Sequence, residues 1–393
     1  MTSVTQSKAQ SAEQFVGAGQ VEAAVIGAGS AGLWAAAELR RRGISALVLE
    51  RGDAVGGSWR GRYEGLRLNT VRRLSGLPGN PIPRRAGSWP AREEFIRYLE
   101  AFADGHRLEI RFGTEVSRVD RAGEEWRLET THGTLDARFV VIATGYDRVP
   151  KIPAWPGRET FAGELIHAAQ YRCAKSLRDK DVLVVGVGNT GTEIATQLVE
   201  GGARCVRVAM RTPVNLVPPT FLGVPMTIFA RMSELSPAAV GDRVGWLVQR
   251  LALGDLAACG MPRAPYGIST ELRIKGLGPV MDRGFVNALK QRRIQLVPAV
   301  ERLDEQDVVL ADETRIRPDT VIAATGYRHG LEGLVGHLGV LLPSGKPSVL
   351  GAKTHPQAPR LYFNGFWLPA SGQLPGMRRT SKQIARAAAR DVR

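Results

Sequence analysis

The sequence predicts an α/β fold with two Rossmann-like dinucleotide-binding domains, one inserted into the other. Two stretches with the spacing Gly-x-Gly-x-x-Gly, residues 27–32 and 186–191, each follow a short apolar run. The tetrapeptide Ala-Thr-Gly-Tyr also occurs twice, at 143–146 and 324–327. We interpret its two copies as segments where the chain crosses between domains, which predicts that both border the cleft between them.

Length and composition fit two globular domains and exclude several other classes of protein. The 393 residues are 44% hydrophobic and 23% charged, which is typical of globular chains. The formal charge of +15 arises from basic residues spread along the whole chain, so we expect anionic small ligands and no nucleic-acid partner. No apolar run is long enough for a transmembrane segment. Residues 1–20 are polar, and we expect them to form a disordered tail.

The cysteines indicate the redox compartment. Cys173, Cys205 and Cys259 are far apart and form no Cys-x-x-Cys pair. This pattern predicts a cytoplasmic protein without disulfides. It also argues against a dithiol redox centre.

The first glycine-rich turn has the flanking elements of a dinucleotide site. Residues 21–26 are expected to form a buried strand, 33–42 a helix and 45–49 a second strand. Glu50 ends that second strand eighteen residues after the last glycine. An acid at about this distance binds a ribose 2′-hydroxyl. The alternative is a surface glutamate beside an ordinary glycine-rich turn.

The residues of the first turn have separate tasks. Gly27 allows the tight turn, Gly29 lets the backbone approach a pyrophosphate, and Gly32 lets the helix pack closely on the strand. Ser30 and Ala31 lie at the expected start of the helix, where free N–H groups can bind phosphate.

The second turn repeats this arrangement with one difference. Strand 181–185, helix 192–200 and strand 205–210 are expected around it. Arg211 then lies twenty residues past the last glycine, where an NAD site would place an acid. A guanidinium there attracts a 2′-phosphate, which predicts NADPH; the alternative is an ordinary surface arginine. The contacts expected in this turn are from Gly186, Gly188, Asn189, Thr190 and Gly191.

The segment between the two turns carries a family signature. Phe161, Gly163, His167 and Tyr171 match every fixed position of Phe-x-Gly-x-x-x-His-x-x-x-(Phe/Tyr). The chain therefore resembles the flavin-containing monooxygenases from residue 21 onward. It is also similar to their auxin-forming YUCCA branch, although those enzymes differ at the position of Asn69. The resemblance implies FAD in the first turn and NADPH in the second, with the NADPH domain inserted into the FAD domain.

The resemblance also implies roles for individual residues. Gly57, Ser58 and Trp59 would lie along the flavin, although Trp59 also fits a core aromatic. Asn69 would lie beside the reactive face of the flavin and act in catalysis; the alternative is a turn asparagine. His167 would have a structural role at the domain joint, near the NADPH pyrophosphate. Further cofactor contacts are expected from Arg51, Thr144, Gly145, Thr325, Gly326, Gln373 and Leu374.

These assignments predict the domain boundaries. The FAD-binding domain would comprise residues 21–155 and 316–393, and the NADPH-binding domain residues 156–315, with a helical insertion at about 213–279.

Within that insertion, residues 240–253 have helical periodicity. Its apolar face would consist of Val240, Val244, Leu247, Val248 and Leu251. We expect this face to pack on the NADPH domain; the alternatives are a substrate entrance or contact with a membrane surface.

The implied activity is monooxygenation of a small molecule with NADPH and O₂. The resemblance implies a C4a-(hydro)peroxyflavin that oxygenates nitrogen or sulfur, or that decarboxylates a 2-oxo acid as in YUCCA enzymes. One alternative is an NADPH-dependent FAD reductase that acts on a quinone or a protein partner without oxygen transfer. Another is a nucleotide-sensing binding module. A homodimer is compatible with the sequence, which does not fix the oligomeric state.

Overall fold

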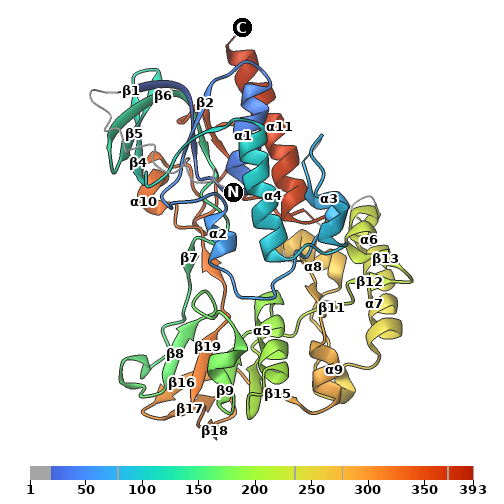
Figure 1. The fold of residues 1–393 in the computed structure, drawn as a ribbon. Coiled ribbons are helices and arrows are strands. Elements are labelled where there is room, and N and C mark those ends of the chain that lie inside the picture. The colour runs from blue at the N-terminus through green and yellow to red at the C-terminus, as the bar shows by residue number, and fades with distance from the viewer. Residues whose placement is uncertain (1–18, 78, 234–235, 277, 370, 393) are drawn as a thin grey trace, which may run out of the picture.

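The computed structural model describes residues 19–77, 79–233, 236–276, 278–369 and 371–392. Two α/β bodies lie one above the other in Figure 1, and a group of helices flanks them on one side. The upper body contains both ends of the described chain, and the lower body is formed by the middle of the sequence.

The first body is built on a seven-stranded sheet. Its order is β3-β2-β1-β6-β5-β4, and β21 also pairs with β6. The strands are β1 (Gly19–Ile26), β2 (Ala46–Leu49), β3 (Glu109–Arg111), β4 (Val116–Ala122), β5 (Glu125–Thr130), β6 (Gly133–Ile142) and β21 (Leu361–Phe363). β1 is parallel to β2 and β6, whereas β4, β5 and β6 form an antiparallel meander.

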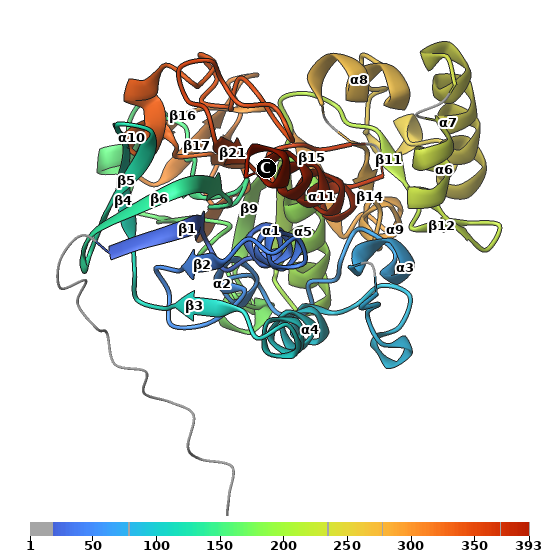
Figure 2. The same cartoon turned by 90° about the horizontal axis from the view of Figure 1, so that it is seen from above.

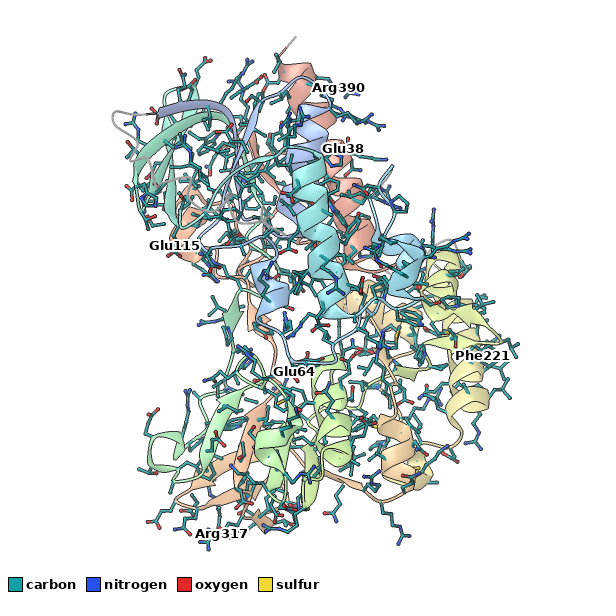
Figure 3. The ribbon with its side chains drawn as sticks, in the orientation of Figure 1. Glu38, Glu64, Glu115, Phe221, Arg317 and Arg390 are labelled. Atoms are coloured by element: carbon teal, nitrogen blue, oxygen red, sulfur yellow. The ribbon has the colours of Figure 1, made fainter. Side chains whose placement is uncertain are left out.

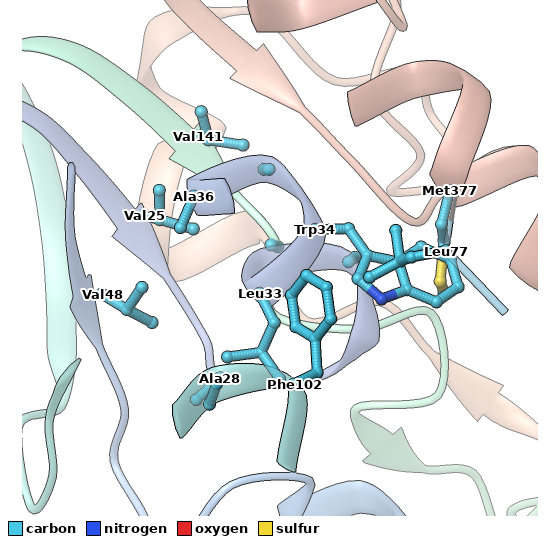
Figure 4. Close-up of a cluster of buried hydrophobic side chains, with 14 of the residues drawn as sticks. Val25, Ala28, Leu33, Trp34, Ala36, Val48, Leu77, Phe102, Val141 and Met377 are labelled. Atoms are coloured by element: carbon cyan, nitrogen blue, oxygen red, sulfur yellow. The ribbon is translucent and has the colours of Figure 1, made fainter. Parts of the chain in front are cut away.

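Helices cover this sheet because their small and apolar side chains pack against it. Along α1 (Ser30–Arg40) nine of eleven residues are buried. Figure 4 shows Leu33 beside Phe102, and Trp34 beside Leu77 and Met377. The other helices of this body are α2 (Gly57–Arg60), α3 (Arg72–Ser75), η1 (Arg84–Ala86), α4 (Arg92–Gly105), α10 (Glu332–Val335), η5 (Gly336–Leu338) and α11 (Gln373–Asp391).

The first strand starts earlier than the sequence predicted. β1 begins at Gly19, and Gly19 and Gln20 pair with Leu135 and Asp136 of β6. Residues 19–20 therefore belong to the sheet and not to a tail. The rest of the expected tail, residues 1–18, lies outside the described residues.

The second body is built on a five-stranded parallel sheet with the order β15-β10-β9-β19-β8. The strands are β8 (Glu164–His167), β9 (Asp181–Val185), β10 (Cys205–Ala209), β15 (Ile294–Val297) and β19 (Thr320–Ala323). Its helices are η2 (Arg158–Thr160), η3 (Ala174–Leu177), α5 (Asn189–Glu200) and α9 (Phe285–Lys290), and a small sheet of β16 (Val300–Asp304), β17 (Asp307–Leu310) and β18 (Arg315–Ile316) adjoins it.

One predicted boundary is wrong. The sequence assigned residues 316–393 to the first body, but β19 pairs with β8 and β9 of the second sheet. The second body therefore extends through residue 323. The reason is that this central strand comes last along the chain, where a period of apolar residues does not reveal its neighbours.

Two crossings join the bodies. β7 (Val149–Pro150) leaves the first body and β20 (Tyr327–Arg328) returns to it. They pair with each other as antiparallel strands, Tyr327 with Pro150 and Arg328 with Val149. β7 closely follows the first Ala-Thr-Gly-Tyr segment, and β20 begins at Tyr327, the last residue of the second. The structure therefore supports the interpretation of these segments as crossings.

The helical insertion lies at one edge of the molecule in both views (Figures 1 and 2). It comprises β11 (Leu216–Val217), β12 (Thr220–Phe221), β13 (Val224–Pro225), α6 (Met226–Ser233), α7 (Ala238–Leu253), η4 (Ala257–Cys259), α8 (Ile268–Lys275) and β14 (Val280–Met281). No helix among the described residues is long and apolar enough to cross a membrane.

The predicted packing of the long insertion helix is wrong. Helix α7 does form, but Val240, Val244, Leu247 and Leu251 are between 48% and 65% exposed. Of the predicted face only Val248 is buried, and it shares the buried side of the helix with Gly245 and Leu253. A helical period identifies an apolar face, but it does not show what covers that face.

Candidate functional site

The first glycine-rich turn joins β1 to α1 through close backbone contacts. A Cβ at Gly27 would lie 2.7 Å from the carbonyl oxygen of Ala143, and a Cβ at Gly32 would lie 1.8 Å from that of Gly27. Both contacts are too short for a side chain. At Gly29 a Cβ would meet nothing within 4 Å. The turn is therefore tight on the sheet side and open at the helix N-terminus, where a phosphate can approach.

The second turn has the same geometry. Gly186 has a φ of +114° and its Cβ would lie 2.6 Å from the carbonyl oxygen of Ala324, and a Cβ at Gly191 would lie 2.0 Å from the carbonyl oxygen of Gly186. Gly188 is again open. Two equivalent turns, each open to an anion, therefore lie at the N-termini of α1 and α5.

Two hydroxyl groups beside the first turn suit a bound phosphate or ribose. Ser30 Oγ, at the start of α1, and Thr144 Oγ1, directly after Ala143, are buried and have no hydrogen-bond partner among the described residues. Buried hydroxyl groups are normally paired. The first turn thus fits a dinucleotide, whose oxygens would complete these hydrogen bonds. Gly145, which follows Thr144, has a φ of +96°.

Glu50 holds the end of β2 against the first turn. Its Oε2 accepts a hydrogen bond from the N–H of Ala28 at 2.7 Å, and its Oε1 accepts one from Gly52 at 2.9 Å. Each carboxylate oxygen can accept a second hydrogen bond, so the predicted ribose contact is compatible with this arrangement. Arg51 beside it is exposed and close enough to Arg148 to lower the pKa of that residue, after the larger effect of burial.

Helix α2 lies over the same turn. The N–H of Gly56 donates to the carbonyl of Ala28 at 3.0 Å. Gly57 and Ser58 are exposed, whereas Trp59 is partly buried and contacts the Phe95 ring edge-on at 4.7 Å. Trp59 therefore packs on the core, as its alternative interpretation expected, and its flavin contact stays a prediction.

Asn69 lies in the loop between α2 and α3, next to the start of α11. A Cβ at Gly372 would lie 2.3 Å from the methyl carbon of Thr70, so the Gly372 backbone lies against the Thr70 side chain. Helix α11 begins directly afterwards with Gln373 and Leu374. The free N–H groups of this helix end therefore lie beside the loop that carries Asn69.

The same loop is held from the other body by a buried polar cluster. Tyr63 donates a hydrogen bond to Glu193 Oε2 of α5 at 2.6 Å. Arg283 Nη2 donates to the carbonyl of Leu68 at 3.0 Å and to Asn69 Oδ1 at 3.4 Å. Arg283 Nε faces Glu193 Oε1 at 3.6 Å. We call Tyr63, Glu193 and Arg283 the joint cluster.

Burial dominates the electrostatics of the joint cluster. It raises the pKa of Glu193, although Tyr63 and Arg283 both oppose this shift. Burial, together with the Glu193 carboxylate, raises the pKa of the Tyr63 hydroxyl, which therefore remains a donor. Burial lowers the pKa of the Arg283 guanidinium. Arg283 Nε and Glu193 Oε1 are buried without another partner, so each depends on the other.

The joint cluster is connected to the second glycine-rich turn. Asn189, the first residue of α5, accepts a hydrogen bond from the N–H of Met281 at 2.9 Å. Met281 lies two residues before Arg283. In addition, Gln197 Nε2 donates to the carbonyl of Glu64 at 2.9 Å, where the loop reaches the lower body (Figure 3). The segment that bears Asn69 therefore contacts both nucleotide-binding units.

The signature residues hold the joint together. His167 Nε2 lies 3.0 Å from the carbonyl oxygen of Gly326, and His167 Nδ1 accepts from the N–H of Ala169 at 3.0 Å. Both contacts require a neutral ring with its proton on Nε2, and burial lowers the pKa of His167 accordingly. Gly326 follows Thr325, whose hydroxyl donates to the carbonyl of Lys151 in the other crossing.

The remaining signature positions are also structural. A Cβ at Gly163 would lie 2.5 Å from the Phe161 ring, so only glycine leaves room for that ring. The Tyr171 hydroxyl donates to Gln197 Oε1 at 3.1 Å. Burial raises the pKa of Tyr171, which keeps the hydroxyl protonated.

Arg211 follows β10 at the open edge of the second turn. It is exposed and forms no salt bridge with a carboxylate of the described residues. A free guanidinium suits an incoming phosphate. Its NADPH contact stays a prediction, as does that of Thr190 in the same turn.

Sequence reasoning missed the joint cluster. Glu193 and Arg283 are ninety residues apart, and neither belongs to a motif. One signal was available in the sequence. Glu193 lies near the start of a helix expected to pack against the sheet, and a buried carboxylate requires a polar or charged partner.

Comparison with known proteins identifies the family. Residues 24–218 match a family profile described as pyridine nucleotide-disulphide oxidoreductase. Indole-3-pyruvate monooxygenase YUCCA1 of Oryza sativa subsp. japonica is 36% identical over 312 residues, which is 78% of this chain and 76% of that protein. Probable indole-3-pyruvate monooxygenase YUCCA9 of Arabidopsis thaliana is 32% identical over 77% of this chain and 74% of its own length.

Solved structures share the fold. A flavin-containing monooxygenase from Stenotrophomonas maltophilia has a TM-score of 0.71 at 25% identity, with 95% of this chain and all of that chain covered. A complex of OTEMO with FAD and NADP has a TM-score of 0.71 at 18% identity, with 95% and 84% covered. The latter supports the two-domain fold alone.

Two nucleotide-binding turns that meet at one loop, together with these relatives, define an NADPH- and FAD-dependent monooxygenase. Such an enzyme places one oxygen atom of O₂ into a small molecule. The chain belongs to the flavin-containing monooxygenase family, in its YUCCA-like branch.

Proposed function

We propose that the enzyme oxidatively decarboxylates an aromatic 2-oxo acid. In this reaction R–CO–COO⁻, O₂, NADPH and H⁺ give R–COO⁻, CO₂, NADP⁺ and H₂O. The bond between the two carbonyl carbons breaks, one oxygen atom enters the new carboxylate, and the other leaves as water. NADPH supplies the two electrons.

The observation that carries this proposal is a pair of guanidinium groups at Trp89, near Asn69: Arg283 lies over the indole ring, and Arg67 binds the backbone carbonyl of the same residue. The guanidinium carbon of Arg283 lies 5.5 Å from the centroid of the Trp89 ring, and Arg67 Nη1 donates to the Trp89 carbonyl at 3.1 Å. No described residue accepts a hydrogen bond from Arg283 Nη1. Cations of this kind bind carboxylates, and the indole of Trp89 offers a surface for an aromatic group.

Names of the relatives support the same substrate class. Several are called indole-3-pyruvate monooxygenases, and indole-3-pyruvate is an aromatic 2-oxo acid. The substrate carboxylate would lie between Arg67 and Arg283, which would place its keto carbon beside Asn69.

The cofactors would be held by the two turns. FAD would occupy the first turn, with phosphate on α1 and ribose on Glu50, and bound FAD supplies the activation of O₂. NADPH would occupy the second turn, with Arg211 on its 2′-phosphate. Asn69 would donate its amide hydrogen bond to the reacting groups while Arg283 holds its carbonyl oxygen. Burial of the joint cluster would help to exclude water from this place.

The three cysteines support a reducing, cytoplasmic location and oppose a dithiol reductase. All three are free thiols, and none is paired with another. A reductase of a quinone or a protein partner would have no use for a carboxylate-binding pair beside Asn69.

A substrate test separates these functions. We expect indole-3-pyruvate to increase NADPH oxidation and to yield one CO₂ and one indole-3-acetate per NADPH. Arg67→Gln should raise KM for the acid by about tenfold, which corresponds to one charge-assisted contact, and leave KM for NADPH unchanged. The control is the alcohol analogue of indole-3-pyruvate, which lacks the carboxylate. The proposal would be contradicted if indole-3-pyruvate did not increase the rate of NADPH oxidation.

A further inference from the structure

The outer edge of the helical insertion presents an unusual number of exposed apolar side chains. Four of them, Val240, Val244, Leu247 and Leu251, form one stripe along α7 and are between 48% and 65% exposed. Their spacing of three or four residues places them on a single helix face, over about 16 Å of helix length. Isolated exposed apolar residues are normal, but a continuous stripe marks an interaction surface.

A second exposed apolar group lies at the same edge. The hairpin of β12 and β13 carries Leu222 at its tip, with 87% of that residue exposed, and Val224 beside it is 37% exposed. Helix α6 follows directly and adds Ile228, which is also 37% exposed. Figures 1 and 2 both place this hairpin, α6 and α7 at the outer edge of the insertion, where Figure 3 labels Phe221.

The conformation of Leu222 is informative. Leu222 has a φ of +47° and Gly223 a φ of +75°. A two-residue hairpin turn with both φ values positive favours Asn-Gly, because asparagine tolerates this region and leucine does not. Folding alone would therefore not select a leucine here. Leu222 thus places an apolar side chain at the most exposed point of the hairpin, where the turn itself does not require one.

The charged residues beside the stripe indicate the chemistry of the partner that binds it. Arg243 and Arg250 lie along one flank of the stripe on α7. Arg250 pairs with Asp255 at 2.8 Å, whereas Arg243 is exposed and pairs with no carboxylate of the described residues. Asp242, the acid within α7, accepts hydrogen bonds from Ser269 and Thr270 of α8 and so faces inward.

We propose that this edge, which we call the insertion face, docks on an anionic lipid bilayer surface. Leu222 and the α7 stripe would enter the headgroup and acyl boundary, and Arg243 beside the stripe would contact lipid phosphate groups. Arg243, which pairs with no carboxylate of the described residues, supplies positive charge directly beside the stripe. A second copy of the chain is the poorer occupant, because it would bring another strongly basic molecule against this basic face.

Vesicle binding tests the proposal with the full-length FAD-loaded protein. We expect it to sediment with vesicles of phosphatidylcholine and phosphatidylglycerol in equal amounts, to bind far less to phosphatidylcholine alone, and to be released by salt. Leu222→Asn should weaken binding about tenfold or more. The same variant should unfold no more easily than the wild type, because asparagine suits the turn.

Control variants make the result decisive. Leu342→Gln changes a leucine that is 48% exposed outside the insertion and should leave binding unchanged. Leu222→Asn should retain the wild-type rate of NADPH oxidation in solution. The proposal fails if Leu222→Asn binds vesicles as tightly as the wild type does, or if lipid charge has no effect. It also fails if sedimentation velocity without lipid shows a dimer that Leu222→Asn dissociates.

Discussion

Replacement of Arg283 should affect stability and catalysis in separable ways. Arg283→Met removes the donor to Leu68 and Asn69 and leaves Glu193 Oε1 without its partner. The two side chains are only 19% and 7% exposed, so solvent cannot replace the lost contact. Loss of one partner of such a pair costs ~3–5 kcal/mol. We expect the free energy of unfolding to fall by about this amount in a urea titration followed by tryptophan fluorescence.

The double variant Arg283→Met/Glu193→Gln separates the two effects. It removes both charges, so stability should return to within about 1–2 kcal/mol of the wild type. The positioning of Asn69 would not return, because its carbonyl oxygen still lacks a donor. We therefore expect most of the NADPH oxidised by the double variant to appear as hydrogen peroxide, measured with a peroxidase-coupled dye.

A matched control is available in the same body. Arg293 Nη2 donates to the carbonyl of Val199 at 2.9 Å but does not contact the Asn69 loop. Arg293→Met should lower stability without raising peroxide release. If the double variant regained full coupling of NADPH oxidation to product, Arg283 would act through the fold alone, and its positioning role would be refuted.

Three further predictions follow from the site. Asn69→Ala should keep the rate of flavin reduction by NADPH and increase peroxide per NADPH; unchanged coupling in that assay would return Asn69 to the role of a turn residue. Arg211→Gln should raise KM for NADPH at least about tenfold, as expected for a lost phosphate contact, and leave KM for NADH unchanged; equal effects on both would exclude the phosphate contact. Burial lowers the pKa of His167 in the folded protein, so unfolding binds a proton and the free energy of unfolding should decline as pH falls below about 6.5. His167→Gln should lack this part of the decline in urea titrations across that range; an identical pH profile would show that the ring is not held neutral.

The sequence correctly predicted the features that depend on local backbone geometry, above all the two glycine-rich turns. The roles of Gly27, Gly32, Gly186 and Gly191 depend on backbone contacts within a few residues or with the adjacent strand, so their spacing was sufficient. The signature from Phe161 to Tyr171 likewise predicted where the two domains meet. Its side chains form structural contacts there, and Gly163 leaves room for the Phe161 ring.

The features that depend on distant partners were missed or misplaced. β19 lies between β8 and β9 in the second sheet but comes more than 100 residues after β10, so apolar periodicity could not place it. The same limit explains α7, whose apolar face is exposed, and the pairing of Glu193 with Arg283. Each of these features depends on which distant segments become neighbours in the folded chain, and a single sequence carries no direct signal of those contacts.

The most direct test follows ¹⁸O₂ into product. The enzyme, loaded with FAD, would be supplied with NADPH, indole-3-pyruvate and ¹⁸O₂, and the acid product analysed by mass spectrometry. We predict one ¹⁸O atom in the new carboxylate for each NADPH oxidised. An unlabelled product, or NADPH oxidation that yields only peroxide, would contradict a site that oxygenates a 2-oxo acid where the two nucleotide-binding bodies meet.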